Sequence, residues 1–382
     1  MHEHKQNQCK RKVKHRKNVM GLIIFCITVG LAFMFTYYQN LRKEISARQK
    51  WLETVLTGEK KWILENQGPE GEIYMNGSKA GDVNPYFACM AALGLLAETK
   101  NCPITETEKK AVDRYLDWHT GILLETDGKM GIYRKESGKL IYKEKADSED
   151  GYLGIYLFLM GKYLEKTEST DLPEYWKKGI SLALKKIQSL MQDGITQVSE
   201  ENTTAYLMDN LEVWKGLHEL ELAGLEDTQA ISEMRKKIQA QIENIFWDDA
   251  NQRWRIIGNS DLYDQTEFYP DGVAQIYPLI YEFPVKEKKK QKILYDQFTE
   301  KFQWQKLNKK RNGFLWAMTG MAAAQMGDIN NLVELIENYE TEYCENRKYP
   351  LYTGEAGWIC MECEKLYRLY ERKIKTGFIL CA

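Results

Sequence analysis

Two kinds of helical segment alternate along the chain from residue 46 onward. One kind is amphipathic and rich in charge, as in TETEKKAVDRYLDW, and the other is apolar on nearly every face, as in YLGIYLFLM. An amphipathic helix belongs at a protein surface, whereas a helix that is apolar all round must be buried. The alternation predicts twelve helices, over residues 46–66, 85–98, 105–119, 148–166, 173–191, 202–223, 228–246, 270–283, 286–302, 313–326, 328–342 and 354–373.

Six outer and six inner helices in alternation predict an all-α fold, an (α/α)6 toroid made of six helical hairpins. The connections that lead from an outer to an inner helix are long and polar, whereas most of the others are short. Because consecutive helices are antiparallel, the long loops should gather at one end, beside the N-termini of the inner helices. Binding and catalytic sites are commonly built from such loops on a rigid scaffold. One of the loops, around Glu136, also has the alternation of a small β-hairpin.

A membrane segment is predicted ahead of this domain. Residues 19–38 contain no charged side chain, and twenty helical residues rise about 30 Å, enough to cross a bilayer. Residues 1–18 carry seven Lys/Arg, which favours a cytoplasmic N-terminus. The alternative is a cleaved signal peptide. We expect a type II protein of the cell membrane, with a basic tail (1–18), a signal-anchor helix (19–38), a short linker (39–45) and an extracytoplasmic domain (46–382).

Charge and residue counts exclude several chemistries. The chain has 53 Lys/Arg and 55 Asp/Glu, and the part after residue 18 is acidic, which argues against a nucleic-acid partner. Three of its five histidines lie in residues 1–18, so a Ser-His-Asp triad or a His-rich zinc site is poorly supplied. The Cys360–Cys363 pair falls in an apolar helical pattern and is interpreted as core thiols; a disulfide elsewhere is left open. We expect no metal and no cofactor.

Carboxylates collect at the predicted loop end of the toroid. An acid near a helix start can be explained by capping or by the helix dipole, and this structural alternative applies to most of them. It explains Asp209 badly, because Asp209 lies in an apolar inner helix, where an unpaired carboxylate would be costly. Asp209 is therefore the first catalytic candidate and Asp150 the second. The acids of this end are Asp82, Asp147, Asp150, Asp209, Glu267, Asp271 and Glu355.

Aromatic and amide side chains accompany these acids. Sugar rings present apolar C–H faces that stack on aromatic rings, and their hydroxyls bond to carboxylates and amides. An acidic and aromatic site on an extracytoplasmic domain therefore favours a carbohydrate partner, although core packing is the structural alternative for each aromatic. The residues expected to bind substrate, besides the acids Asp147, Glu267, Asp271 and Glu355, are Tyr86, Tyr206, Asn210, Tyr269, Trp316 and Trp358.

Five segments, spread over roughly residues 50–372, together carry a family resemblance. They are DVNPYFACMAALGLL from Asp82, ADSEDGY from Ala146, YLMDNLEVW from Tyr206, YPDGVAQIYP from Tyr269 and GEAGW from Gly354. With these segments, the chain resembles the bacterial six-hairpin glycosidase-like superfamily, which includes family-8 endoglycanases and unsaturated glucuronyl hydrolases. The resemblance implies an (α/α)6 toroid, a general acid in the loop before an inner helix, where Asp82 stands, and an Asp on an inner helix, where Asp150 and Asp209 are candidates.

Two functions remain open at this point. The first is a membrane-anchored glycoside hydrolase acting on cell-wall or secreted polysaccharide, with Asp82 or Asp150 as the acid and Asp209 as the base. The second is a non-catalytic glycan-binding or polysaccharide-assembly protein that keeps the same scaffold. Release of reducing sugar from a panel of glycans separates them.

Overall fold

The computed structural model divides the chain into two compact units, one of residues 1–52 with 367–382 and one of residues 53–366. The domain predicted over residues 46–382 stays a prediction. Within helices, the side chains of residues 2–19, 21–24 and 376–381 are outside the description. The structure describes residues 2–77, 81–136, 139–169, 172–225, 228–258, 260, 264, 266–307 and 313–381.

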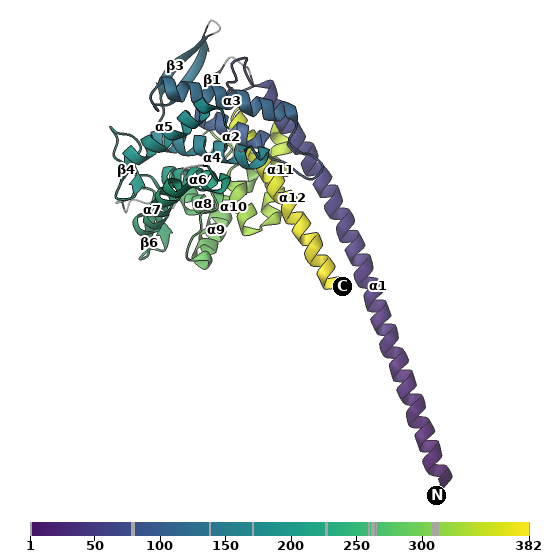
Figure 1. Ribbon diagram of the computed structural model, residues 1–382. Coiled ribbons are helices and arrows are strands. Elements are labelled where there is room, and N and C mark those ends of the chain that lie inside the picture. Colours follow the sequence, from purple (N-terminus) through teal and green to yellow (C-terminus); the bar gives the residue numbers. More distant parts are fainter. Residues whose placement is uncertain are drawn as a thin grey trace. The chain divides into compact units, whose positions relative to one another are not determined.

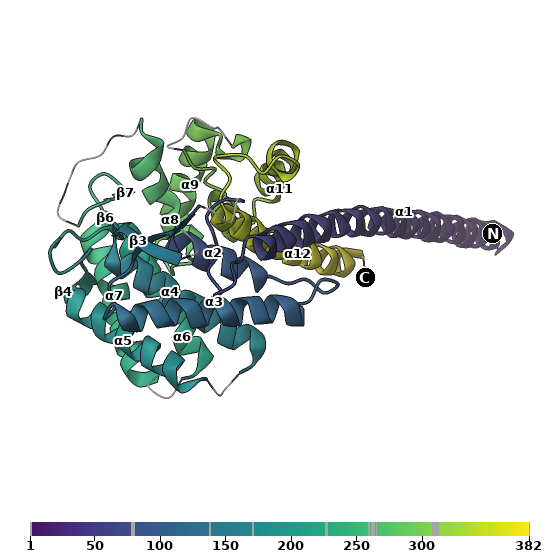
Figure 2. The same cartoon turned by 90° about the horizontal axis from the view of Figure 1, so that it is seen from above.

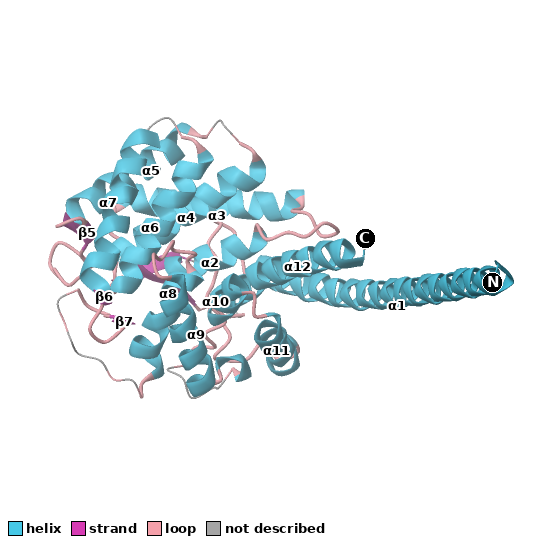
Figure 3. Cartoon of the chain, turned by 90° about the horizontal axis from the view of Figure 1, so that it is seen from below, coloured by secondary structure: helices cyan, strands magenta, loops and turns pink. Residues whose placement is uncertain are grey.

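Helices dominate these described residues, as the colouring of Figure 3 makes plain. Each predicted helix has a counterpart, and most boundaries agree within a few residues. The counterpart of the first is much longer and runs through residues 39–45, which were predicted as a linker. The helices are α1 (His2–Glu65), α2 (Pro85–Leu95), α3 (Glu106–Glu125), α4 (Glu149–Thr167), α5 (Glu174–Leu190), α6 (Leu207–Ala223), α7 (Thr228–Phe246), α8 (Val273–Ile280), α9 (Lys288–Phe302), α10 (Thr319–Met326), α11 (Ile329–Tyr339) and α12 (Thr353–Cys381).

The inner helices form a closed ring within residues 53–366. Helices α2, α4, α6, α8 and α10 contact one another in that order, and each also packs against the outer helix that follows it in sequence. Helix α12 closes the ring, because a Cβ atom built on Gly94 of α2 would lie 2.5 Å from the Cα of Gly357 in α12. Only glycine allows two helix backbones to approach so closely. Figure 2 shows the helical pairs arranged around this ring. The predicted alternation of inner and outer helices is confirmed.

Strands in the described residues are short and lie in the loops, as one three-stranded sheet and two separate pairs. The longest pair is a hairpin of β2 (Gly131–Glu136) and β3 (Lys139–Lys145), at the position predicted from its alternation; its turn residues, 137 and 138, lie outside the described residues. The hairpin leads into α4 (Figure 1). The other strands are β1 (Asp82–Val83), β4 (Met191–Gln192), β5 (Ile195–Thr196), β6 (Trp247–Asp248) and β7 (Arg253–Trp254). The three-stranded sheet has the order β1–β2–β3.

Helix α10 begins later than predicted, at Thr319 instead of residue 313. The backbone N–H groups of Leu315, Trp316 and Ala317 point to the carboxylate of Glu355, at distances of 2.9–3.2 Å. These hydrogen bonds replace the intrahelical ones, so residues 315–317 wrap around a carboxylate instead of forming a helical turn.

The predicted membrane segment is not identified as a span. Among the residues whose side chains are described, no helix is both long and apolar enough to cross a membrane. The side chains of residues 19 and 21–24, which belong to the predicted segment, lie outside that description.

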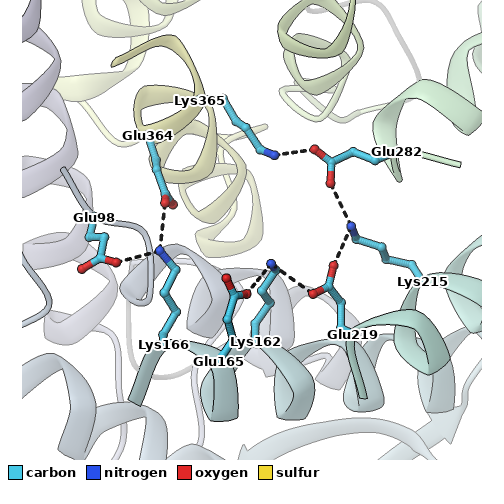
Figure 4. Close-up of polar contacts among 9 residues, drawn as sticks. All are labelled: Glu98, Lys162, Glu165, Lys166, Lys215, Glu219, Glu282, Glu364 and Lys365. Atoms are coloured by element: carbon cyan, nitrogen blue, oxygen red, sulfur yellow. Dashed lines mark hydrogen bonds and ion pairs between the residues drawn. The ribbon is translucent and has the colours of Figure 1, made fainter. Parts of the chain in front are cut away.

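Toward the C-terminal ends of the inner helices, charged side chains from α4, α6 and α12 are linked through ion pairs (Figure 4). Lys215 Nζ lies 2.7 Å from Glu219 and 3.0 Å from Glu282, and Lys162 Nζ lies 3.1 Å from Glu219. Lys215 and Glu219 are almost fully buried, with side chains 5% and 3% exposed. This network binds neighbouring inner helices together at the end away from their N-termini.

Candidate active site

The first turn of α4 presents a buried carboxylate, Asp150. Ser148 caps the helix by accepting the backbone N–H of Gly151, at 3.1 Å. The same hydroxyl donates to Asp150 Oδ1 at 2.8 Å, and Thr196 donates to Asp150 Oδ2 at 2.6 Å. Asp150 is fully buried, and both of its oxygens already accept hydrogen bonds within the protein. It therefore supports the site without being exposed to a ligand.

Asp209 approaches Asp150 from the first turn of α6. A Cβ atom built on Gly151 would lie 3.5 Å from Asp209 Oδ1, 2.9 Å from Ser148 Oγ and 2.8 Å from Glu212 Oε2. Glycine at this position leaves the room in which the carboxylates of α6 meet the start of α4. Asp209 is partly exposed, unlike Asp150 and Glu212. The three acids Asp150, Asp209 and Glu212 are called the acid cluster below.

Glu212 is held by three tyrosine hydroxyls. Tyr86 donates to Glu212 Oε1 at 2.6 Å, Tyr277 at 2.7 Å and Tyr281 at 3.2 Å. Tyr86 lies on α2 and Tyr277 on α8, and Tyr281 directly follows the last residue of α8. Because one oxygen receives all three bonds, the side chain is fixed in one orientation and Oε2 faces Gly151.

The acid cluster favours protonated carboxyls. Burial, followed by the charges of Asp150 and Glu212, raises the pKa of Asp209 well above its usual range. Burial also raises the pKa of Asp150 to about 6 and that of Glu212 to about 7, although the hydroxyl groups bound to each lower it. Carboxyls this close cannot all be ionised, because like charges in a desolvated site repel. Groups with pKa values raised toward neutrality are suited to proton transfer.

One aromatic side chain, Tyr269, and a further acid, Asp147, lie near Asp209. The rings of Tyr269 and Trp316 lie 4.7 Å apart, and both are partly exposed. The pKa of Tyr269 is raised to about 12, first by burial and then by the charges of Asp209 and Asp147, so these acids lie near its hydroxyl. Asp147 is exposed. Tyr206 also acts on Tyr269 electrostatically and is half-buried. The structure thus brings the acids Asp209 and Asp147 close to the aromatic pair of Tyr269 and Trp316.

The structure does not place Asp82 in this cluster. Asp82 accepts hydrogen bonds from Arg134 at 2.6 Å and from Lys143 at 2.8 Å, both on the β2–β3 hairpin. The hydrogen bond from Arg134 is the main cause that lowers the pKa of Asp82. A carboxyl with a lowered pKa is a poor proton donor near neutral pH, and Asp82 fastens the hairpin; its role as a general acid stays a prediction.

Three other residues expected to bind substrate are buried in the structure. Asn210 is fully buried; its amide donates to Thr196 O and Tyr206 O, and its oxygen accepts the N–H of Thr196, so no part of it remains for a sugar. Asp271 is buried and accepts the N–H of Asp264 at 2.9 Å. Trp358 is 5% exposed.

Two further acids that were expected to bind substrate, Glu355 and Glu267, differ in their exposure to solvent. Glu355 is buried, and both of its oxygens accept the backbone N–H groups of residues 315–317, so its contact with substrate stays a prediction. Burial raises the pKa of Glu355 to about 7, against the effect of those bonds. By contrast, Glu267 is exposed, in the loop before α8. Its role stays a prediction.

Sequence reasoning missed Glu212, Tyr277 and Tyr281; it named Tyr86 as a substrate-binding residue but did not predict its bond to Glu212. A usable signal existed, because Asp209 and Glu212 are three residues apart on an apolar helix and so share one face. The tyrosine partners had no such signal, since Tyr86 is more than a hundred residues away from Glu212 in sequence.

The cysteines and histidines stay outside the acid cluster. Cys360 and Cys363 are fully buried, which confirms that they are core thiols, and the described cysteines are all free. His119 is buried beside Tyr115, with 3.0 Å between its Nδ1 and the hydroxyl, and His218 stacks on Trp214. Burial lowers the pKa of His119 to about 3, so it is neutral.

No protein-family model matches the chain, and no curated protein matches its sequence. Solved structures do match its fold. A glycosidase is 12% identical, covers 86% of this chain and 98% of its own, and has a TM-score of 0.59. D-mannose isomerase is 11% identical, with coverage of 84% and 97% and a TM-score of 0.56. An inactive variant of an α-1,6-mannanase from Salegentibacter sp. in complex with α-1,6-mannotriose is 11% identical, with coverage of 83% and 99% and a TM-score of 0.51.

These neighbours define the class of fold. The chain shares its fold, the (α/α)6 toroid predicted from the alternation of its helices, with these solved structures. Because the neighbours include both hydrolases and an isomerase, the scaffold by itself fixes no reaction, and the chemistry must be argued from the site.

Proposed function

We propose that this protein is a glycoside hydrolase that acts on a polysaccharide by carboxylate acid/base catalysis. The observation that carries the proposal is the acid cluster: three carboxyls with raised pKa values converge at the loop end of the ring, and Asp209 is the partly exposed one. Acid/base hydrolysis of a glycosidic bond needs one protonated carboxyl and one carboxylate.

Asp209 is the proton donor in this proposal. Its raised pKa keeps it protonated near neutral pH, so it can protonate the leaving oxygen of a glycosidic bond. The exposed Asp147 is the base that activates water, because its charge acts on both Asp209 and Tyr269. Asp150 and Glu212 are positioning residues that keep Asp209 protonated. The roles expected from sequence, with Asp209 as base and Asp150 as acid, are thereby revised.

A hexose-containing glycan is the proposed substrate. The mannanase with the same fold was solved with α-1,6-mannotriose, which supports a sugar chain as the ligand class. The partly exposed rings of Tyr269 and Trp316, beside Asp209, supply the apolar surface that sugar C–H faces need.

The first experiment is release of reducing sugar from a panel of α-1,6-mannan, starch, cellulose oligomers and cell-wall polysaccharide. We expect at least one glycan to be cleaved. Since the donor must be protonated, the rate should fall on the alkaline side of its pH profile. Asp147→Asn should remove most of the turnover. The comparison variant Glu267→Gln changes an exposed acid in the loop before α8 and tests whether loss of any negative charge in these loops lowers turnover. Equal losses in both variants would contradict the assignment of Asp147.

A non-catalytic glycan-binding or polysaccharide-assembly protein is the second candidate. One observation favours it: Asp150 and Glu212 are engaged by hydroxyl groups of the protein itself, as purely structural carboxylates would be. Saturable binding of a glycan without cleavage of any member of the panel would favour this candidate over the hydrolase.

For localisation, we propose a single-pass type II anchor with the large domain outside the cytoplasmic membrane. The uncharged residues 19–38 and the basic residues before them support this orientation. Protease added to intact protoplasts should then degrade the large domain. A domain that stays fully protected until the membrane is permeabilised would overturn the orientation.

A further inference from the structure

Five aromatic side chains from three loops form a continuous row. Neighbouring ring centres along the row are 4.7–6.2 Å apart. The loops are those that lead into α8, α10 and α12, so the row follows the loop end of the ring. Its members in order are Tyr269, Trp316, Phe314, Tyr352 and Tyr349, called the aromatic row below.

The aromatic row is not part of the hydrophobic core. All five members are partly or fully exposed, and the two ends are the most exposed, with Tyr269 at 39% and Tyr349 at 71%. Large aromatic side chains gathered on loops in this way mark interaction sites. The middle of the row is also held in place, because the buried Glu355 binds the backbone of Trp316. Trp316 has a positive φ of 60°, a conformation that a bulky residue adopts only when its surroundings hold it.

The row lies near the acid cluster at its Tyr269 end and is linked to it indirectly from its middle. At its Tyr269 end, the charges of Asp209 and Glu212 act on the tyrosine hydroxyl. In its middle, Phe314 stacks on Phe87 with ring centres 5.6 Å apart. Phe87 directly follows Tyr86, which donates a hydrogen bond to Glu212. A ligand that lies on the row therefore ends beside the acids.

We propose that the aromatic row binds successive sugar rings of an extended glycan, with the end at Tyr269 delivering one linkage to Asp209. The inference rests on the proposed function and deepens it: the substrate class is an oligosaccharide or polysaccharide chain of several rings, not a monosaccharide or disaccharide. Neighbouring rings of the row meet at interplanar angles of 37–80°, so they offer a succession of ring faces and edges to the sugars, and affinity grows with the length of row that is covered. The row extends to one side of Asp209, toward α12, so the chain is held mainly on that side of the cleaved bond.

The test measures binding as a function of chain length. Full-length protein carrying Asp209→Asn, in detergent, is titrated calorimetrically with mannooligosaccharides (α-1,6), maltooligosaccharides and cellooligosaccharides, each from disaccharide to hexasaccharide. In at least one series the affinity should rise with length. Tyr349→Ala in the same background should weaken binding of the hexasaccharide by about tenfold, equivalent to about 1.4 kcal/mol, and leave the disaccharide unchanged.

Tyr175→Ala is the matched control. Tyr175 is a 37% exposed tyrosine on the outer helix α5, outside the row, and its removal should change no affinity. The proposal that the aromatic row binds successive sugar rings would be overturned by either of two results. One is an affinity that is independent of chain length in all three series, and the other is a Tyr349→Ala variant that binds the hexasaccharide as tightly as its parent. The hydrolase proposal fails separately, when glycans bind with the expected length dependence but the unsubstituted protein cleaves none of them.

Discussion

Replacing Asp209 by Asn should lower turnover on a cleaved glycan by about 10²–10⁴-fold while the protein stays folded. The amide has nearly the shape of the carboxyl, but it cannot deliver a proton to the leaving oxygen. Binding of the same glycan should persist, because the aromatic surface around Tyr269 is unchanged. Initial rates and calorimetric affinity on the same preparation separate the two effects.

Asp209→Asn should also raise the melting temperature at alkaline pH. The pKa of Asp209 is raised in the folded protein by burial and by Asp150 and Glu212, so ionisation of this carboxyl opposes folding. Its cost is present above the folded pKa and disappears as the pH falls toward the unfolded value of about 3.9. The gain in melting temperature of the variant should therefore be largest at high pH and shrink on acidification.

The matched control is Asp296→Asn, at an exposed acid on the outer helix α9. It should keep both activity and stability. A structural Asp209 would give the opposite pattern, with a lower melting temperature and full activity for each folded molecule. Full activity of Asp209→Asn would remove Asp209 from the mechanism.

The second large effect is expected at the opposite ends of the inner helices, in the network of Figure 4. Lys215→Met should destabilise the protein by about 3–5 kcal/mol, because it leaves the buried Glu219 with one cation fewer and leaves Glu282 with Lys365 alone. The midpoint of thermal unfolding should fall by on the order of 5–10 °C.

The pH dependence of this loss has a defined sign. Burial opposes ionisation of Glu282, but Lys215 and Lys365 lower its pKa to about 2, and the pKa of Glu219 is lowered in the same way, chiefly by Lys215. The stability that these carboxylates contribute is present above their unfolded pKa of about 4.3 and is lost as the pH falls toward 2. The difference between parent and variant should thus be largest near neutral pH and shrink in acid.

Lys292→Met is the control for this loss. Lys292 pairs with Asp296 on α9, where both side chains are more than half exposed, 59% and 54%. Exposed pairs contribute little, so the change should stay within about 1 kcal/mol. A Lys215→Met variant as stable as Lys292→Met would show that the buried network is dispensable.

The sequence by itself determined the helices, their alternation and the end at which the acids gather. Burial imposes a pattern on every residue of a helix, so an inner helix such as α4 is visible as an apolar stretch and an outer one such as α3 as an amphipathic stretch. The same pattern singled out Asp209, because a carboxyl within an apolar helix stands out against it. The small β2–β3 hairpin was visible for a similar reason, since its alternation is local.

Only the tertiary structure decided which side chains meet. Asp82 and Asp209 were both catalytic candidates from the sequence, yet Arg134 and Lys143 of the hairpin neutralise Asp82, whereas Asp209 lies near other acids. Glu355 likewise reads as a ligand at a helix start, but it binds the backbone before α10. Such pairings join residues far apart in the chain, and no local periodicity encodes them. Proton affinity depends on those partners and on burial, so the assignment of acids to roles follows from the closed ring and not from the sequence pattern.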